Sequence, residues 1–230
     1  PWIAYYLGTL LYDRKRYDEA IALWERSAAG IPDFSIPRRN LGIAYFNVQD
    51  DPDKAIASYE TAFSVNPGDG RLLSELDQLR RRTGVGPEAR LAALEAHMPL
   101  VRSRDDLSVK ITTLYNLTGQ PQKALDYVLS RRFHPWEGGT GLISRQYVKA
   151  HLLLGKEALA DGDADAALAH FESAQATYPE NLGERKHLNW ADADVHYYTG
   201  VAKQRLGDES GARESFRCVR SRIWTPLPPR

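Results

Sequence analysis

Small and apolar residues return along the chain in a fixed order. A Leu-Gly pair is followed by an Ala, by an aromatic residue four positions later, and then by a Pro, and the first two copies lie 34 residues apart. The copies are Leu7, Gly8, Ala20, Trp24 and Pro32; Leu41, Gly42, Ala55, Tyr59 and Pro67; Leu154, Gly155, Ala167, Phe171 and Pro179; and, with more drift, Gly200, Ala212 and Phe216. Residues four positions apart share one face of a helix. The period therefore predicts repeated units of two helices joined by a turn.

A second pattern places the turns inside these units. Four glycines each stand five residues before an Ala: Gly84 before Ala89, Gly119 before Ala124, Gly162 before Ala167, and Gly207 before Ala212. Glycine is favoured just past the end of a helix because it adopts a positive φ without a Cβ clash. Each glycine is therefore expected at the bend between two helices, and each Ala is expected to let the second helix approach the first.

Together the two patterns predict six helix pairs. We place them at about 1–34, 35–69, 70–102, 103–134, 143–180 and 190–222, so that residues 1–222 form the repeat array and 223–230 a Pro-rich tail. Asp77 and Thr112 stand where the other pairs have Gly. The third and fourth pairs therefore need a different packing between their helices.

The order Leu-Gly, Ala, aromatic and Pro in this period resembles the tetratricopeptide repeat (TPR) family. That resemblance implies an all-α, right-handed superhelical solenoid of about six helix-turn-helix pairs. In such an array each repeat buries its face on its neighbours, and no single central core is needed. The resemblance also implies a concave groove lined by the first helix of each pair.

Composition limits the classes of partner. The 230 residues include 30 Lys and Arg and 30 Asp and Glu, so the formal net charge is zero and no global field favours nucleic acid or an anionic membrane. No apolar run has the length of a spanning helix, and the N-terminus lacks the blocks of a signal peptide. With one cysteine, Cys218, an internal disulfide is impossible. We expect a cytoplasmic protein that binds neither nucleic acid nor membranes, of unknown oligomeric state.

The expected binding surface is the concave groove. Matching positions along the first helices yields the groove candidates Tyr5, Thr9, Tyr12, Arg39, Ile43, Phe46, Asn47, Gln78, Arg81, Thr113, Asn116, Lys156 and Gln204. Aromatic anchors among adaptable polar groups suit a peptide or a helix of another protein. The run Arg80-Arg81-Arg82 is either a solvated helix end or an anchor for an acidic partner. A solvated groove without a ligand is the alternative interpretation.

Two long connections interrupt the period, at residues 133–142 and 180–190. Both join the second helix of one pair to the first helix of the next, so they are expected on the same edge, where insertions in repeat arrays often bind. The candidates at this edge are His134, Trp136, Glu137, Glu180, Asn181, Glu184 and His187. The alternative is purely structural: Trp136 fills a gap between repeats, glycines form turns, and Glu180 or Asn181 caps a helix.

These connections also carry a narrower resemblance. The runs 130–138 and 178–184 resemble the TPR tail of long bacterial proteins in which an uncharacterised, mutarotase-like β domain precedes the tail. This resemblance implies a second function, in which the chain packs against a carbohydrate-active domain and completes its site. The apolar start at Trp2, Ile3, Tyr5 and Tyr6 suggests a piece excised from a longer polypeptide.

No pattern predicts catalysis or a cofactor. The run 138–141 lacks the Lys-Ser/Thr of a phosphate loop. His187, Asp192, Asp194 and His196 do not match a zinc spacing. We therefore expect no enzyme activity, no metal and no cofactor, and we predict an interaction scaffold whose partner is a protein or peptide.

Overall fold

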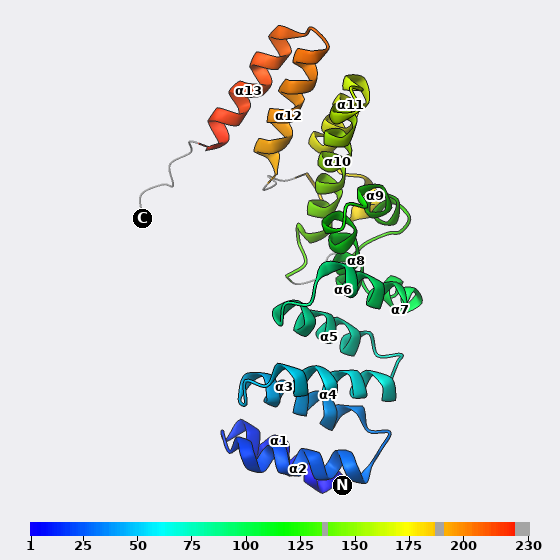
Figure 1. The fold of residues 1–230 in the computed structure, drawn as a ribbon, viewed down its shortest axis with the longest axis vertical. Coiled ribbons are helices and arrows are strands. Elements are labelled where there is room, and N and C mark those ends of the chain that lie inside the picture. The colour runs from blue at the N-terminus through cyan, green and yellow to red at the C-terminus, as the bar shows by residue number, and fades with distance from the viewer. Residues whose placement is uncertain (135–137, 187–190, 224–230) are drawn as a thin grey trace. The chain divides into compact units, whose positions relative to one another are not determined.

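A computed structural model describes residues 1–134, 138–186 and 191–223 (Figure 1). These residues are mostly helical, and none of them lies in a strand. They divide into two compact units, residues 1–107 and the residues from 108 onward. The predicted all-α class, built from paired helices, is confirmed.

The first unit holds three helix pairs and a short extra helix. Its helices are α1 (Trp2–Asp13), α2 (Tyr17–Gly30), α3 (Ser35–Asn47), α4 (Pro52–Val65), α5 (Gly70–Arg82), α6 (Pro87–Glu95) and α7 (Met98–Arg102). Each first helix packs on the second helix of its own pair, and α2 and α4 also pack on the first helix that follows them. Every inner helix is therefore covered on two sides.

The second unit repeats this plan with longer connections. Its elements are α8 (Asp105–Leu117, whose first three residues belong to the first unit), α9 (Pro121–Leu129), α10 (Leu142–Ala160), α11 (Ala164–Gln175), the 3-10 helix η1 (Glu180–Leu182), α12 (Asp192–Arg205) and α13 (Glu209–Ile223). Helix α10 packs on α9 and α11, and α12 packs on α11 and α13. The sequence patterns did not indicate α7.

The bends inside the pairs use one backbone conformation. The four predicted glycines all have positive φ: 83° at Gly84, 69° at Gly119, 85° at Gly162 and 81° at Gly207. In the first two pairs Lys15 (φ 62°) and Asp50 (φ 51°) take the same conformation without being glycine. The bend is thus common to all six pairs, and the glycine pattern revealed only four of them.

A small residue on the first helix lets an aromatic ring of the second helix lie against its backbone. A Cβ added at the glycine would approach the ring to 2.8 Å for Gly8 and Trp24, 2.5 Å for Gly42 and Tyr59, 2.3 Å for Gly155 and Phe171, and 2.5 Å for Gly200 and Phe216. Such distances are shorter than van der Waals contact, so only glycine fits at these four positions. The repeating Gly and aromatic residues of the sequence are therefore two halves of one contact.

In the third and fourth pairs, both the glycine of the first helix and the aromatic residue of the second helix are replaced. Asp77 and Thr112 stand in the glycine position, and the residues that replace the ring, Leu94 and Val128, are buried aliphatic side chains. A narrower side chain on the second helix thus accompanies a wider residue on the first. The two changes conserve the total volume between the helices.

The buried position that was predicted at Ala89 lies one residue later, at Arg90. Ala89 is exposed, and the buried position belongs to Arg90, whose backbone N–H donates to Gly86 as that of Ala55 donates to Asp51. The turn after Gly84 contains one extra residue, Val85, before the helix starts at Pro87. The spacing rule of five residues therefore fails in this pair.

Arg90 forms a buried ion pair with Asp77. Its Nε and Nη2 each donate to one carboxylate oxygen at 2.9 Å, and the two side chains are 9% and 3% exposed. The pair occupies the place where the other repeats bring glycine and alanine together. A buried charge pair holds its geometry strongly because losing either partner leaves an unpaired charge.

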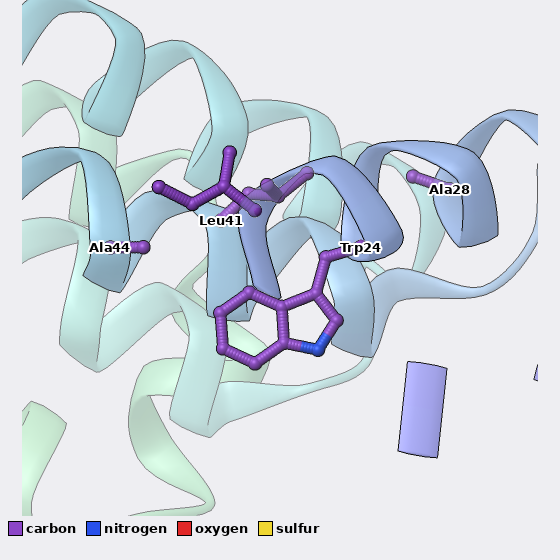
Figure 2. Close-up of a cluster of buried hydrophobic side chains, with 5 residues drawn as sticks. Trp24, Ala28, Leu41 and Ala44 are labelled. Carbon is purple, nitrogen blue, oxygen red and sulfur yellow. The ribbon is translucent and has the colours of Figure 1, made fainter. Parts of the chain in front are cut away.

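Contacts between successive pairs use apolar side chains. Ile21, Trp24 and Ala28 of α2 form one buried cluster with Leu41 and Ala44 of α3, and Figure 2 shows the Trp24 ring beside these residues. The α2 residues lie three and four positions apart, so they form one stripe of the helix. This stripe is what stacks one repeat upon the next.

The second unit contains a pair of histidines between α10 and α11, of which His151 is buried and His170 is half-buried. Nδ1 of His151 lies 3.1 Å from Nδ1 of His170, and the Tyr147 ring packs edge-on against His151 at 4.6 Å. Burial, and then the neighbouring His170, lower the pKa of His151 to about 4. Burial also lowers the pKa of His170, although the charge of Glu157 acts in the opposite direction. The pair therefore stays uncharged at neutral pH.

We expect Asp77→Ala to lower the free energy of unfolding by about 3–5 kcal/mol, because it leaves the guanidinium of Arg90 buried without a counter-charge. The double variant Asp77→Leu with Arg90→Met replaces the ion pair by apolar side chains of similar volume and should lie within about 2 kcal/mol of the wild type. Urea denaturation measures both values. Arg16→Ala, which removes the exposed partner of Glu19, is the matched control and should have no measurable effect. A double variant as unstable as Asp77→Ala would contradict this account.

The histidine pair predicts acid sensitivity. The pKa of His151 is lower in the folded than in the unfolded state, so its contribution is fully present above pH ~6.5 and is lost as the pH falls toward 4. The loss should be roughly 2–3 kcal/mol in unfolding free energy. Urea denaturation across this range should show a shallower pH dependence for His151→Gln. Gln204→Ala, an uncharged change at an exposed position, is the control and should leave the slope unaltered; an equal reduction there would contradict the assignment.

Candidate functional site

Five of the predicted groove residues gather in one pocket between α3 and α5. The pocket has a volume of about 210 Å³, and it is lined by Arg39, Gly42, Ile43, Phe46, Asn47, Tyr59, Glu75, Gln78, Leu79 and Arg82. These side chains come from the first helices of two successive pairs and from Tyr59 of α4. A stack of repeats thus brings positions 36 residues apart, such as Arg39 and Glu75, into contact.

Glu75 organises one side of the pocket. Arg39 donates two hydrogen bonds to its carboxylate, at 2.6 and 2.7 Å, Arg71 donates another at 2.9 Å, and the hydroxyl of Tyr59 donates one at 3.1 Å. Burial alone would raise the pKa of Glu75, but the bonds from Arg39 and Arg71 outweigh it, so the pKa lies below its usual value. The carboxylate is charged and fully bonded, and it shapes the pocket rather than binding a ligand.

The same network affects its other members. The hydrogen bond to Glu75 raises the pKa of Arg39 despite partial burial. Burial, followed by the negative charge of Glu75, raises the pKa of Tyr59. Both groups therefore keep their protons over the whole accessible pH range, and the network does not titrate near neutrality.

The opposite side of the pocket leaves its polar groups available. Arg82 stacks its guanidinium over the Phe46 ring at 4.8 Å, and within the described residues no carboxylate forms an ion pair with it. Asn47 and Gln78 are exposed beside it, and Ile43 supplies a half-buried apolar wall. This rim offers one cation, two primary amides and apolar surface, a set that can hold a carboxylate beside a hydrophobic side chain.

The sequence analysis selected Arg81 from the arginine run, but the neighbouring Arg82 lines the pocket. Arg81 is exposed but does not line the pocket, whereas Arg82 does. Glu75 and Arg71 were also absent from the candidates. The opposite charges of Arg39 and Glu75 at one repeat's separation were the signal that could have identified the network.

The candidates on α1 pack within the first pair. The Tyr5 ring lies 5.1 Å from that of Phe34, and Tyr12 lies 5.2 Å from Trp24. Thr9 donates its hydroxyl hydrogen to the carbonyl of Tyr5 at 3.1 Å. These residues are half-buried, and none of them lines the pocket between α3 and α5.

The candidates of the second unit lie apart from one another. Asn116 is buried, and its amide donates to the backbone and side-chain oxygens of Gln146 at 3.1 and 3.2 Å, which ties α8 to α10. Thr113 donates to the carbonyl of Val109, and Lys156 lies 4.9 Å from the Tyr198 ring. Gln204 is exposed.

The two long connections meet, as the binding interpretation of them requires. Asn181 donates from Nδ2 to the carbonyls of Val128 and Arg131, each at 2.8 Å, and accepts at its own carbonyl from the N–H of Phe133 at 2.8 Å. Farther along, Glu184 accepts from the N–H of Gly141 at 2.7 Å. Asn181 therefore caps the end of α9, which is the structural role considered for it.

A shallow hollow of about 450 Å³ opens at this junction. Arg132, Glu180 and Asn181 line it. Glu180 and His134 are exposed, while Oε2 of Glu184 is buried and accepts no hydrogen bond from the residues that the structure describes. The remaining candidates of this edge, Trp136, Glu137 and His187, lie outside the described residues.

The part of the chain that the structure describes holds neither a cluster of three or more metal ligands nor a membrane-spanning helix. Across residues 1–134, 138–186 and 191–223, no three His, Cys, Asp or Glu side chains group as ligands of a metal ion would. Over the same ranges, no helix combines the length and hydropathy that crossing a membrane demands.

Comparison with known proteins identifies the fold. No family model matches the chain. Among solved structures it is similar to Naa15/Naa10 bound to HypK-THB, at 17% identity and a TM-score of 0.58, over 94% of this chain but only 30% of that one. It is also similar to YrrB, "a TPR protein with an unusual peptide-binding site" (16%, TM-score 0.55, 86% of this chain and 91% of that one), and to MamA (16%, 0.53, 86% and 100%). At such identities the likeness concerns architecture, and the architecture of this chain is the helical solenoid of TPR proteins.

Proposed function

We propose that the chain is a non-catalytic interaction module that binds an extended protein segment in the pocket between α3 and α5. The carrying observation is the stack of Arg82 on Phe46 beside two amides, a cation that no carboxylate of the described residues pairs with, at the edge of an apolar wall. YrrB has a peptide-binding site according to its description, and its fold is similar. The bound segment carries a carboxylate next to an apolar side chain.

The network around Glu75 supports this assignment. Because Arg39, Arg71 and Tyr59 satisfy its carboxylate, it neither attracts a cationic ligand nor moves when a segment binds. The positive groups exceed the negative one in this part of the surface, so an acidic segment is favoured over a basic one. A guanidinium that already rests on an aromatic ring has also lost part of its rotamer freedom before binding.

The test compares two labelled decapeptides, one of alternating aspartate and leucine and one of alternating asparagine and leucine. Fluorescence anisotropy should show that the acidic peptide binds more tightly and that salt weakens it. Arg82→Glu should reduce the affinity about tenfold or more, equivalent to about 1.4 kcal/mol. Arg213→Glu, the same charge change on the exposed surface of α13, is the matched control. Equal affinity for both peptides, or an equal loss of affinity in the control variant, would contradict the proposal.

A second candidate function uses the junction of the two long connections. We infer from their convergence at Asn181, and from the hollow beside Glu180, that this edge can receive another domain of the same polypeptide. The resemblance of runs 130–138 and 178–184 to tails that follow a mutarotase-like domain implies that this domain is carbohydrate-active. The junction is held together by its own hydrogen bonds, so it presents a defined surface.

This candidate predicts an in-frame β domain encoded upstream of Pro1, which sequencing of the gene checks. In the longer protein, hydrogen exchange at amides 131–134 and 180–184 should slow relative to this chain alone, because docking excludes water from the junction. Amides of α5 serve as the reference and should exchange equally in both. An upstream stop codon, or unchanged exchange at the junction, would contradict the second function.

A further inference from the structure

Two histidine rings face each other between the helices of the fifth pair. His151 lies on α10 and His170 on α11, with 3.1 Å between their Nδ1 atoms and 5.3 Å between the ring centroids. His151 is 8% exposed, whereas His170 is half-buried, so the pair lies at the edge of the contact between the two helices. Neither the pocket between α3 and α5 nor the hollow beside Glu180 is lined by these side chains.

The fold sets the distance between the two rings. One histidine stands four residues before Gly155, and the other directly precedes Phe171, the two residues whose contact brings the helices together. In the fourth pair the same two positions hold Ser108 and Tyr127, whose hydroxyl oxygens lie 2.9 Å apart. Polar side chains at these positions thus meet in both pairs, and the fifth pair places a ring nitrogen at each of them.

The separation of the two nitrogens is close to that of two ligands of one metal ion. A tetrahedral ion about 2.0–2.1 Å from each nitrogen, as in zinc sites, holds the two nitrogens about 3.3 Å apart. The Nδ1 atoms lie 3.1 Å apart, so they need to separate by only about 0.2 Å. The rings must also turn so that both lone pairs aim at an ion beside the line that joins them. His170 is only half-buried, so its ring can supply most of that movement.

Both rings are in the protonation state that binds metal. Because the pKa of His151 is lowered to about 4 and the pKa of His170 also lies below its usual value, both imidazoles are neutral at neutral pH. In the hydrogen bond between them, one of the two Nδ1 atoms carries the proton. Binding of an ion moves that proton to Nε2 of the same ring. Both Nδ1 atoms then become ligands, and no proton has to leave the pair.

The type of ligand selects the class of ion. Imidazole nitrogen suits the ions of zinc, copper and nickel, whereas calcium and magnesium take oxygen ligands. The negative charge of Glu157, which acts on His170, adds attraction for a cation. Two protein ligands leave two positions of a tetrahedral ion open, in contrast to the closed four-ligand sites that hold a fold together. Water or donor atoms of a bound molecule complete the coordination.

We propose that His151 and His170 form a half-site for one divalent transition-metal ion of the zinc class, which both Nδ1 atoms bind at the edge of the contact between α10 and α11. The two histidines are 19 residues apart on different helices, so no zinc spacing in the sequence indicated them, and the expectation of no metal overlooked this arrangement. The half-site is separate from the pocket between α3 and α5, and the proposal does not depend on the function assigned to that pocket.

The test titrates zinc chloride into the metal-free chain at neutral pH and measures binding by calorimetry. One zinc ion per chain should bind, and magnesium should not. His151→Asn and His170→Asn should each weaken zinc binding about tenfold or more, because each removes one of the two ligands. His97→Asn changes a histidine that packs on Phe63 in the first unit, and it is the matched control, with the affinity of the wild type.

A second measurement needs no variant. In nitrogen-15 NMR of the wild-type chain, zinc should shift the Nδ1 signals of both rings and leave both Nε2 atoms protonated. Circular dichroism checks that the variants fold. The proposal is overturned if zinc does not bind, if either histidine variant of the pair keeps the wild-type affinity, or if His97→Asn weakens binding equally. Shifts confined to other histidines would also overturn it, since they would indicate an adventitious ion only.

Discussion

The structure depends on how closely two helices of one pair can approach. In four pairs a glycine on the first helix receives an aromatic ring of the second, at a distance that admits no Cβ. In the other two pairs a larger residue on the first helix is matched by Leu94 or Val128 on the second. Volume is thus conserved locally while its distribution between the helices changes. The repeat tolerates different residues at these two positions because only the summed volume of the two side chains is constrained.

Stacking such pairs creates the surfaces that can bind. Helices α3 and α5 are each covered by the second helix of the preceding pair, and the pocket between them forms from the sides that this cover leaves free. The same rule leaves the outer face of α1, with Ile3, Tyr6, Leu7 and Leu10, without a cover inside its own unit. The pocket and the outer face of α1 differ in chemistry: cationic, polar and apolar groups line the pocket, whereas the outer face of α1 is apolar.

Charged residues inside this fold serve mainly to hold it. Asp77 and Arg90 fill an interface that is apolar elsewhere, and Glu75 is bonded by two arginines and a tyrosine. Arg38 donates to the carbonyls of Ala28 and Phe34, each at 2.9 Å, and so satisfies one carbonyl in the last turn of α2 and one just before α3. Charges with such partners are poor candidates for binding. Arg82 differs because its neighbour is a ring and not a carboxylate.

The sequence by itself determined the all-α class, the helix pairs and four of the six bends, because period, glycine position and aromatic spacing are local properties of the chain. It also placed Arg39, Ile43, Phe46, Asn47 and Gln78 on one surface. Only the tertiary structure revealed the positive φ of Lys15 and Asp50 and the shift from Ala89 to Arg90, since an extra turn residue leaves no periodic signal. The structure also showed that Arg82, and not Arg81, lines the pocket and that Asn181 bonds to the end of α9. Both facts depend on contacts between segments far apart in the sequence, which a local pattern does not encode.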